Sequence, residues 1–249
     1  MEVTRRFSGL DRLYGVDSAS AVRGAHVVVV GIGGVGSWAA EALARSGVGR
    51  LTLIDMDHVA ESNINRQVHA LSTTLGMAKV TAMNERIALI NPNCNVTCVD
   101  AFVDVDNWPG IIPSDVDAVI DACDQVGAKT AMADWARRSK VTFVAVGAAG
   151  GKRHGHRVNI ADLSAATHDP LLAQVRYRLR KSHQAPQGGK KMGVTCVFST
   201  EAVQVAHASC QIQGDRTLNC HGYGSIVTVT ATFGLCAAGW VIDKVSSAG

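Results

Sequence analysis

The chain has 249 residues and a formal net charge of +3, and 47% of its residues are hydrophobic. These values are typical of a globular protein with one large or two small domains, and so weak a charge does not by itself indicate nucleic-acid binding. The seven cysteines include no Cys-x-x-Cys pair, which argues against a zinc site and favours a reducing, cytoplasmic location.

The first 24 residues are interpreted as an N-terminal arm. Residues 5–15 (RRFSGLDRLYG) are basic and aromatic, and they precede a short predicted helix at Ser18–Arg23. Residues 1–12 lack the apolar core of a signal peptide. We therefore expect the arm to pack on the surface of the domain.

A glycine-rich turn follows an apolar run at Val27–Val30. The run predicts a strand buried on both faces of a parallel sheet, and a helix is expected from Ser37 to about Arg45, with free N–H groups at its start that attract anions. A second predicted strand, Leu51–Ile54, ends on Asp55, where a carboxylate can bind a ribose. The turn contains four glycines that let the backbone approach a ligand closely: Gly31, Gly33, Gly34 and Gly36. This pattern predicts a nucleotide site.

Cations follow the ribose-binding acid. Asn63 and Arg66 are three residues apart and would share one face of a helical turn, and Lys79 lies early in a predicted helix. Asp124 follows a predicted strand, and strand ends carry the ligand groups in open parallel sheets. A nucleoside triphosphate needs several cations, whereas a dehydrogenase cofactor does not. We therefore expect ATP, with Asp124 as a candidate ligand of Mg²⁺.

The remaining elements alternate between strand and helix as far as residue 151. The predicted segments are a helix at about Leu75–Ile90, a strand at Asn95–Val99, a strand at Asp117–Ile120, a helix at Gly127–Ser139 and a strand at Val141–Val146. Alternation of this kind predicts an α/β fold with a Rossmann-like, doubly wound, mostly parallel sheet. We expect a single domain over 1–249, with a nucleotide-binding half at 25–151 and a substrate and interface half at 152–249 that adds C-terminal strands and a helix.

The second half contains a basic segment. Between predicted strands at Arg157–Ile160 and Val194–Phe198, the chain has no acidic residue after Asp169. We interpret four of its cations as candidate phosphate-backbone contacts to RNA, although a solvated helix face is the alternative: Arg176, Arg178, Arg180 and Lys181. Residues 182–193 contain one proline and three glycines, which favour turns, and are expected to form a mobile loop.

Two further features each allow two interpretations. Cys196 lies in a predicted strand, where a buried thiol is more common than a reactive one. Residues 226–242 carry no charge over seventeen positions, which is the short limit for a membrane span. A buried helix or a subunit interface explains the same segment, and we favour that interpretation.

Four ordered motifs resemble the adenylation domain of the ubiquitin-activating superfamily, which includes the bacterial sulfur-carrier activators. They are GIGGVGSWAAEALARSGVG, LIDMDHVAESNINRQ, GMAKV and DACD. Within that superfamily, RFSGLDRLYG, SNINRQVHAL, INPNC, GAAGG, DPL and GVTCVFSTEA resemble the branch that dehydrates threonylcarbamoyladenosine in tRNA. The resemblance covers about 5–202 and resumes at 228–234.

The resemblance implies a role for each matching residue. The four glycines would form the phosphate turn and Asp55 would bind the ribose. Asp124 would hold Mg²⁺ or position the nucleotide, and Arg12 would complete the partner's site in a homodimer. Cys196 matches the place of a thioester-forming cysteine in other members. The residues implied at the phosphate end are Asp57, Asn63, Arg66 and Lys79.

The implied reaction is ATP-dependent. A carboxylate on the modified adenosine of tRNA would attack the α-phosphate, and the ureido oxygen would then displace AMP and close a ring. One alternative is adenylation of the C-terminal glycine of a ubiquitin-like sulfur-carrier protein. Another is an inactive nucleotide-binding scaffold that docks a sulfur-transfer protein. A monovalent cation site is compatible with each of these interpretations.

Overall fold

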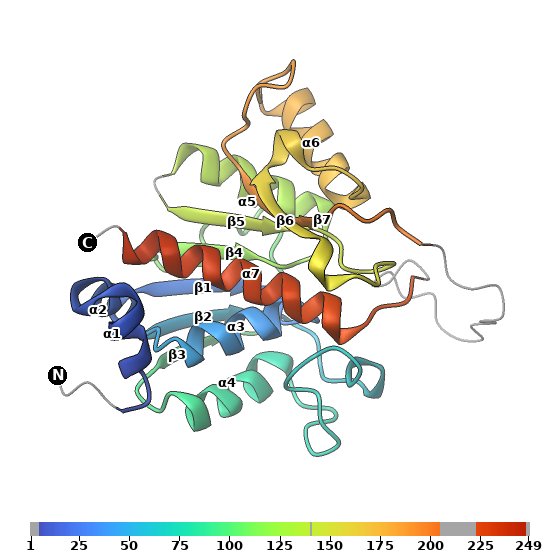
Figure 1. Cartoon of the computed structure of the whole chain (residues 1–249). Helices are drawn as coiled ribbons and strands as arrows, with labels where there is room; N and C mark the ends of the chain where they lie inside the picture. The colour runs from blue at the N-terminus through green and yellow to red at the C-terminus, as the bar shows by residue number, and fades with distance from the viewer. Residues whose placement is uncertain (1–4, 140, 205–222, 248–249) are drawn as a thin grey trace.

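The fold is built on one seven-stranded sheet with helices on both faces (Figure 1). The computed structural model describes residues 5–139, 141–204 and 223–247. The strand order is β3-β2-β1-β4-β5-β7-β6, and all neighbouring pairs are parallel except β6 with β7. The strands are β1 (His26–Val30), β2 (Arg50–Ile54), β3 (Asn95–Val99), β4 (Ala118–Asp121), β5 (Thr142–Val146), β6 (Val158–Asp162) and β7 (Thr195–Ser199). The predicted doubly wound α/β fold is confirmed.

The helices form two layers. One face of the sheet carries α2 (Val16–Gly24), α3 (Gly36–Arg45), α4 (Lys79–Ile90) and α7 (Val227–Ser246), and the other carries α5 (Val126–Arg138) and α6 (Pro170–Ser182). The N-terminal helix α1 (Ser8–Tyr14) packs beside α2. Three short 3-10 helices complete the described elements: η1 (Glu61–Asn63), η2 (Gly155–Arg157) and η3 (Leu163–Ala165).

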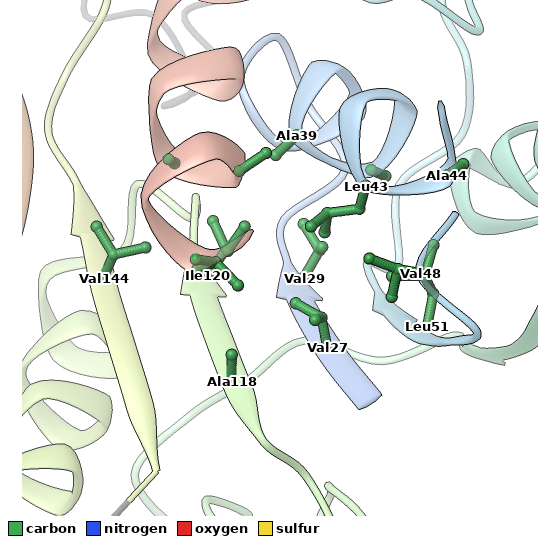
Figure 2. Close-up of a cluster of buried hydrophobic side chains, with 14 of the residues drawn as sticks. Val27, Val29, Ala39, Leu43, Ala44, Val48, Leu51, Ala118, Ile120 and Val144 are labelled. Carbon is green, nitrogen blue, oxygen red and sulfur yellow. The ribbon is translucent and has the colours of Figure 1, made fainter. Parts of the chain in front are cut away.

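The core follows from the apolar run that begins the fold. All five residues of β1 are buried, because α3 and α7 cover one face of the sheet and α5 and α6 cover the other. Figure 2 shows Val27 and Val29 on β1 beside the helix that carries Ala39 and Leu43, and all four belong to one buried cluster. Burying the side chain of one valine or leucine contributes about 1.5–3 kcal/mol, so this cluster holds the start of the sheet rigidly.

The predicted start of α4 is wrong by four residues. Gly76 has a φ of 82°, its amide donates to the Val59 carbonyl, and the Val59 amide donates to the Met77 carbonyl. This turn keeps the residues before Lys79 out of the helix, which therefore begins at Lys79. The structure also contains α1, for which no separate helix was expected in the basic and aromatic segment.

Helix α7 runs along the strands over the middle of the sheet, from their carboxyl ends to their amino ends (Figure 1). Ten of its twenty residues are buried, and it makes extensive contact with α3. At its far end the phenol of Tyr14 donates a hydrogen bond to Asp243 (2.6 Å), which raises the pKa of Tyr14 to about 12. None of the described helices combines the length and hydropathy that a membrane-spanning segment needs.

Candidate nucleotide-binding and active site

The candidate site lies at the carboxyl ends of β1 and β4. These strands are neighbours, and the chain leaves β1 toward β2 on one side while β4 continues toward β5 on the other. A doubly wound sheet forms its ligand crevice at such a switch point. The turn at 31–36 and the loop at 122–125 flank this crevice.

The glycine turn is tight enough to require glycine. Gly31 has a φ of 84°, and a Cβ on it would lie 2.9 Å from the backbone nitrogen of Cys123. A Cβ on Gly36 would lie 1.8 Å from the carbonyl oxygen of Gly31. The absence of side chains therefore brings the start of α3 directly to the crevice, where its free N–H groups suit an anion.

Asp55 supports this turn from the end of β2. Its Oδ2 accepts a hydrogen bond from the Ile32 amide (2.6 Å), and its Oδ1 accepts one from the Asp57 amide (2.8 Å). The carboxyl group is buried, and this burial raises its pKa against the opposing effect of Lys79. The predicted ribose-binding acid is thus held in place by two backbone amides.

Lys79 is buried at the first turn of α4. Its Nζ lies 2.7 Å from Asp57 Oδ2 and 4.0 Å from Asp55 Oδ1. Only 6% of the residue is exposed, so it is not the solvated surface charge that a lysine on a helix usually is. The structure therefore brings Lys79, Asp55 and Asp57 together beside the glycine turn.

Asp124 lies three residues beyond β4 and reaches solvent. Partial burial of its carboxyl group still raises the pKa of Asp124, and the negative charge of Asp57 raises that pKa further. The positive charges of Lys129 and Lys79 lower it. Asp124 thus belongs to the same charged group as Asp57 and Lys79, which come from a different part of the sheet. The strand-end prediction placed it correctly at the crevice edge.

Arg66 lies over the glycine turn through its aliphatic stem. A Cβ on Gly34 would lie 3.3 Å from Arg66 Cγ, and the Arg66 guanidinium donates to the Ser62 carbonyl (2.6 Å) and to Asn65 Oδ1 (3.0 Å). Asn63 is buried, and its Oδ1 accepts a hydrogen bond from the Ala60 amide (3.1 Å). Arg66 thus lies beside the turn, whereas Asn63 fixes the backbone of its own segment at Ala60.

Sequence reasoning missed two contributions to the site. Lys129 is fully buried behind the Asp124 loop, where its Nζ lies 2.8 Å from Asp121 Oδ1 and donates to the Asp121 carbonyl (3.1 Å). Thr230 of α7 reaches the turn from far along the chain, with its Cγ2 3.2 Å from the Cβ position of Gly34. The resemblance that resumes at residues 228–234 was a signal for Thr230, whereas no sequence pattern marked Lys129.

Arg12 and Cys196 lie away from this group. Arg12 is exposed on α1. This helix lies near the amino end of β1, at the end of the sheet opposite the crevice. Cys196 is buried in β7, and burial raises the pKa of its thiol far above its ordinary value. The position of Cys196 favours the packing interpretation over the reactive thiol.

The four basic residues of α6 divide into two pairs. The Arg176 guanidinium donates to the carbonyls of Leu163 (3.1 Å) and Ala166 (2.8 Å), and the Arg180 guanidinium donates to the Pro186 carbonyl (3.2 Å). Arg178 and Lys181 are exposed. The second pair is therefore available for a phosphate backbone, while the first pair holds neighbouring loops of the protein.

The carboxylates of the crevice fit a magnesium ion that is shared with phosphates. No group of three His, Cys, Asp or Glu side chains in the described ranges could hold a metal by itself. Mg²⁺ commonly takes one or two carboxylates, together with phosphate oxygens and water. Asp124 suits this role better than Asp57, whose Oδ2 already accepts a hydrogen bond from Lys79.

A family model that matches almost the whole chain decides its classification. The model of the ThiF family matches residues 7–249. The chain belongs to the ThiF family. This ThiF-family chain is 45% identical to the tRNA threonylcarbamoyladenosine dehydratase of Haemophilus influenzae, over 96% of this chain and 93% of that protein. It is 44% identical to the Escherichia coli protein of the same name, with the same coverage.

Solved structures agree with this ThiF-family placement. The structure of the E. coli tRNA N6-threonylcarbamoyladenosine dehydratase in complex with ATP matches with a TM-score of 0.88 and 43% identity, over 98% of this chain and 95% of that chain. The same E. coli protein was also solved in complex with AMP and matches with 44% identity. The fold of the ThiF-family chain is therefore that of a nucleotide-binding protein, from the arm to α7.

Proposed function

We propose that this ThiF-family protein is a tRNA threonylcarbamoyladenosine dehydratase that uses ATP to cyclise N6-threonylcarbamoyladenosine through a carboxyl-adenylate. The observation that carries the proposal is the 44–45% identity, over 96% of the chain, to two bacterial proteins of that name. Identity of this extent reaches both halves of the chain, including the basic helix and α7. The crevice geometry supports the same conclusion, because it gathers the charged residues that a triphosphate requires.

The proposed chemistry has two steps. The carboxylate oxygen of the threonylcarbamoyl group attacks the α-phosphorus of ATP, and pyrophosphate leaves. The ureido oxygen then attacks the activated carbonyl carbon, AMP leaves with the former carboxylate oxygen, and a ureido N–H proton is released. The tRNA nucleoside thereby loses one water overall. Positioning and charge neutralisation are sufficient for both displacements, so no protein nucleophile is required.

The side chains contribute in different ways. Gly31 and Gly36 let the phosphates reach the start of α3, and Asp55 accepts hydrogen bonds from the ribose hydroxyl groups. Lys79 and Arg66 neutralise the phosphate end. Asp124 would hold Mg²⁺, which when bound neutralises phosphate charge and withdraws electrons from the attacked phosphorus.

Several further assignments belong to this proposal. Arg12 would complete the site of a second copy in a homodimer, since it lies at the edge of the sheet opposite its own crevice. Arg178 and Lys181 would contact the tRNA backbone. The single sheet shared by 25–151 and 152–249 supports one functional domain. The free thiols at five described cysteines support a reducing cytoplasm: Cys94, Cys98, Cys123, Cys196 and Cys236. Mobility of 182–193, a monovalent cation and a sulfur-transfer partner remain predictions.

One experiment separates the proposed function from its rivals. The purified protein is incubated with ATP and tRNA that carries threonylcarbamoyladenosine, and the nucleosides are then measured by mass spectrometry. We expect loss of one water from the modified nucleoside together with AMP and pyrophosphate. Release of ADP would contradict the adenylate route. ATP–pyrophosphate exchange only with a small carrier protein would favour the sulfur-carrier alternative, which has support in 35% identity to the E. coli molybdopterin-synthase adenylyltransferase over 53% of the chain.

A further inference from the structure

A second charged hollow lies at the end of the sheet where the parallel strands begin, opposite the crevice at their carboxyl ends. It has a volume of about 510 Å³ and is lined by three arginines and three apolar residues: Arg6, Phe7, Arg45, Arg86, Leu89 and Ile90. Helix α3 starts at the carboxyl edge and ends before β2 begins, so Arg45 at its end lies at the opposite edge. The function proposed above makes no use of this hollow.

The protein holds the three arginines in place before any ligand arrives. Glu41, which is 4% exposed, accepts a hydrogen bond from Arg45 Nε (2.7 Å), one from Arg86 Nε (2.7 Å) and one from Arg86 Nη2 (3.1 Å). Arg6 Nη1 donates to the Ile90 carbonyl at the end of α4 (2.7 Å). Ordering a free arginine costs conformational entropy, so side chains fixed in this way bind an anion with a smaller loss of entropy.

The charge of the hollow is only partly neutralised. Glu41 is the single carboxylate that pairs with these arginines among the described residues, which leaves the four side chains with a net charge of +2. The hydrogen bonds in this region use one nitrogen of Arg6, one of Arg45 and two of Arg86. The remaining N–H groups suit a tetrahedral anion, because guanidinium groups bind phosphate oxygens in pairs.

The apolar wall adds information about the ligand. Leu89 is 83% exposed, and the Phe7 ring lies against Gly47, 3.1 Å from its Cβ position. An apolar surface next to three cations favours a phosphate that carries an organic group over a bare anion. We propose that the hollow binds the phosphate group of a phosphate ester. The ester could be a free nucleotide or a nucleotide of the tRNA backbone, and both present the same chemistry.

The test uses ribose 5-phosphate, a phosphate ester found in both candidate sources, as the probe and full-length protein whose crevice is filled with a non-hydrolysable ATP analogue. Calorimetric titration is carried out on the wild type, on the double variant Arg6→Gln/Arg45→Gln and on Arg50→Gln as a control. Arg50 is also a surface arginine at the amino edge, but it pairs with Asp115 outside the hollow. The double variant keeps the Arg86–Glu41 pair, so its thermal unfolding temperature should stay at the wild-type value.

We expect ribose 5-phosphate to bind the analogue-loaded wild type and the Arg50 control alike, and to bind the double variant at least about tenfold more weakly, as loss of charge-assisted hydrogen bonds predicts. No binding of this ester by the wild type, or equal binding by the double variant, would overturn the proposal. A tRNA-binding assay on the same proteins distinguishes the two sources. A parallel loss of tRNA affinity assigns the phosphate to the tRNA backbone, and unchanged affinity assigns it to a free ester.

Discussion

His69 is expected to make the folded protein sensitive to acid. It is 1% exposed, and neither ring nitrogen has a hydrogen-bond partner within the described part of the chain. Burial, together with the charges of Lys79 and Arg86, lowers its pKa from 6.5 to about 4. The folded protein therefore keeps the imidazole neutral, whereas the unfolded chain takes up a proton below about pH 6.5.

The magnitude follows from the two pKa values. A difference between 6.5 and about 4 corresponds to at most ~3.4 kcal/mol of unfolding free energy, and this stabilisation is fully present above the pKa of the unfolded chain. As the pH falls from about 7 to about 4.5, His69 should therefore remove ~2.5 kcal/mol of stability. This is a large fraction of the 5–15 kcal/mol that is typical of folded domains.

The variant His69→Leu isolates this contribution. Leucine has no polar atom to leave without a partner, so we expect stability at neutral pH to be equal to or above that of the wild type. Urea unfolding of both proteins at about pH 7 and about pH 4.5 measures the difference, with a His58→Gln variant of an exposed histidine as the control. If the leucine variant loses as much stability on acidification as the wild type does, the reasoning is wrong.

Four further predictions concern the crevice and the tRNA. Lys79→Gln should weaken ATP binding by about 10- to 100-fold, as expected for loss of a charge-assisted hydrogen bond, and an unchanged calorimetric affinity would remove Lys79 from the phosphate site. Asp124→Ala should abolish pyrophosphate exchange at an unchanged melting temperature, whereas a collapsed melting temperature would indicate a structural role. Arg12→Ala should be inactive alone, and mixing it with Asp124→Ala should restore part of the activity; no restoration would contradict a residue shared between subunits. Arg178 and Lys181 changed together to Ala should reduce the slope of log affinity against log salt by up to about 2 in filter binding, and an identical slope would exclude them from the RNA contact.

The local patterns of the sequence predicted most of the fold. Apolar runs identified β1 and β2, and the acid at the end of β2 was correctly expected beside the glycine turn. The start of α4 was missed because the apolar spacing from Val80 to Ile90 indicates a helix but not its first residue, while backbone pairing of Val59 with Gly76 and Met77 decides where the helix begins. Such pairing joins residues that are far apart in the sequence, so a short sequence window does not contain both partners.

The candidate site was predictable in its residue types but not in its partners. The sequence order of Asp55, Lys79 and Asp124 indicates a shared crevice once the sheet is known. It does not indicate that Lys79 is buried against Asp57, or that Arg176 bonds to two backbone carbonyls and leaves the exposed positions to Arg178. These outcomes depend on side-chain burial, which a charge count along one helix cannot distinguish from exposure.

The two ends of α7 connect places that would belong to different active sites. One end touches the glycine turn through Thr230, and the other is hydrogen-bonded to the arm through Tyr14 and Asp243. If Arg12 of each copy completes the site of the other, as proposed above, this helix connects the nucleotide of one copy with the arginine that serves the other. We then expect ATP titration of such a dimer to show two unequal affinities that become equal in Tyr14→Phe.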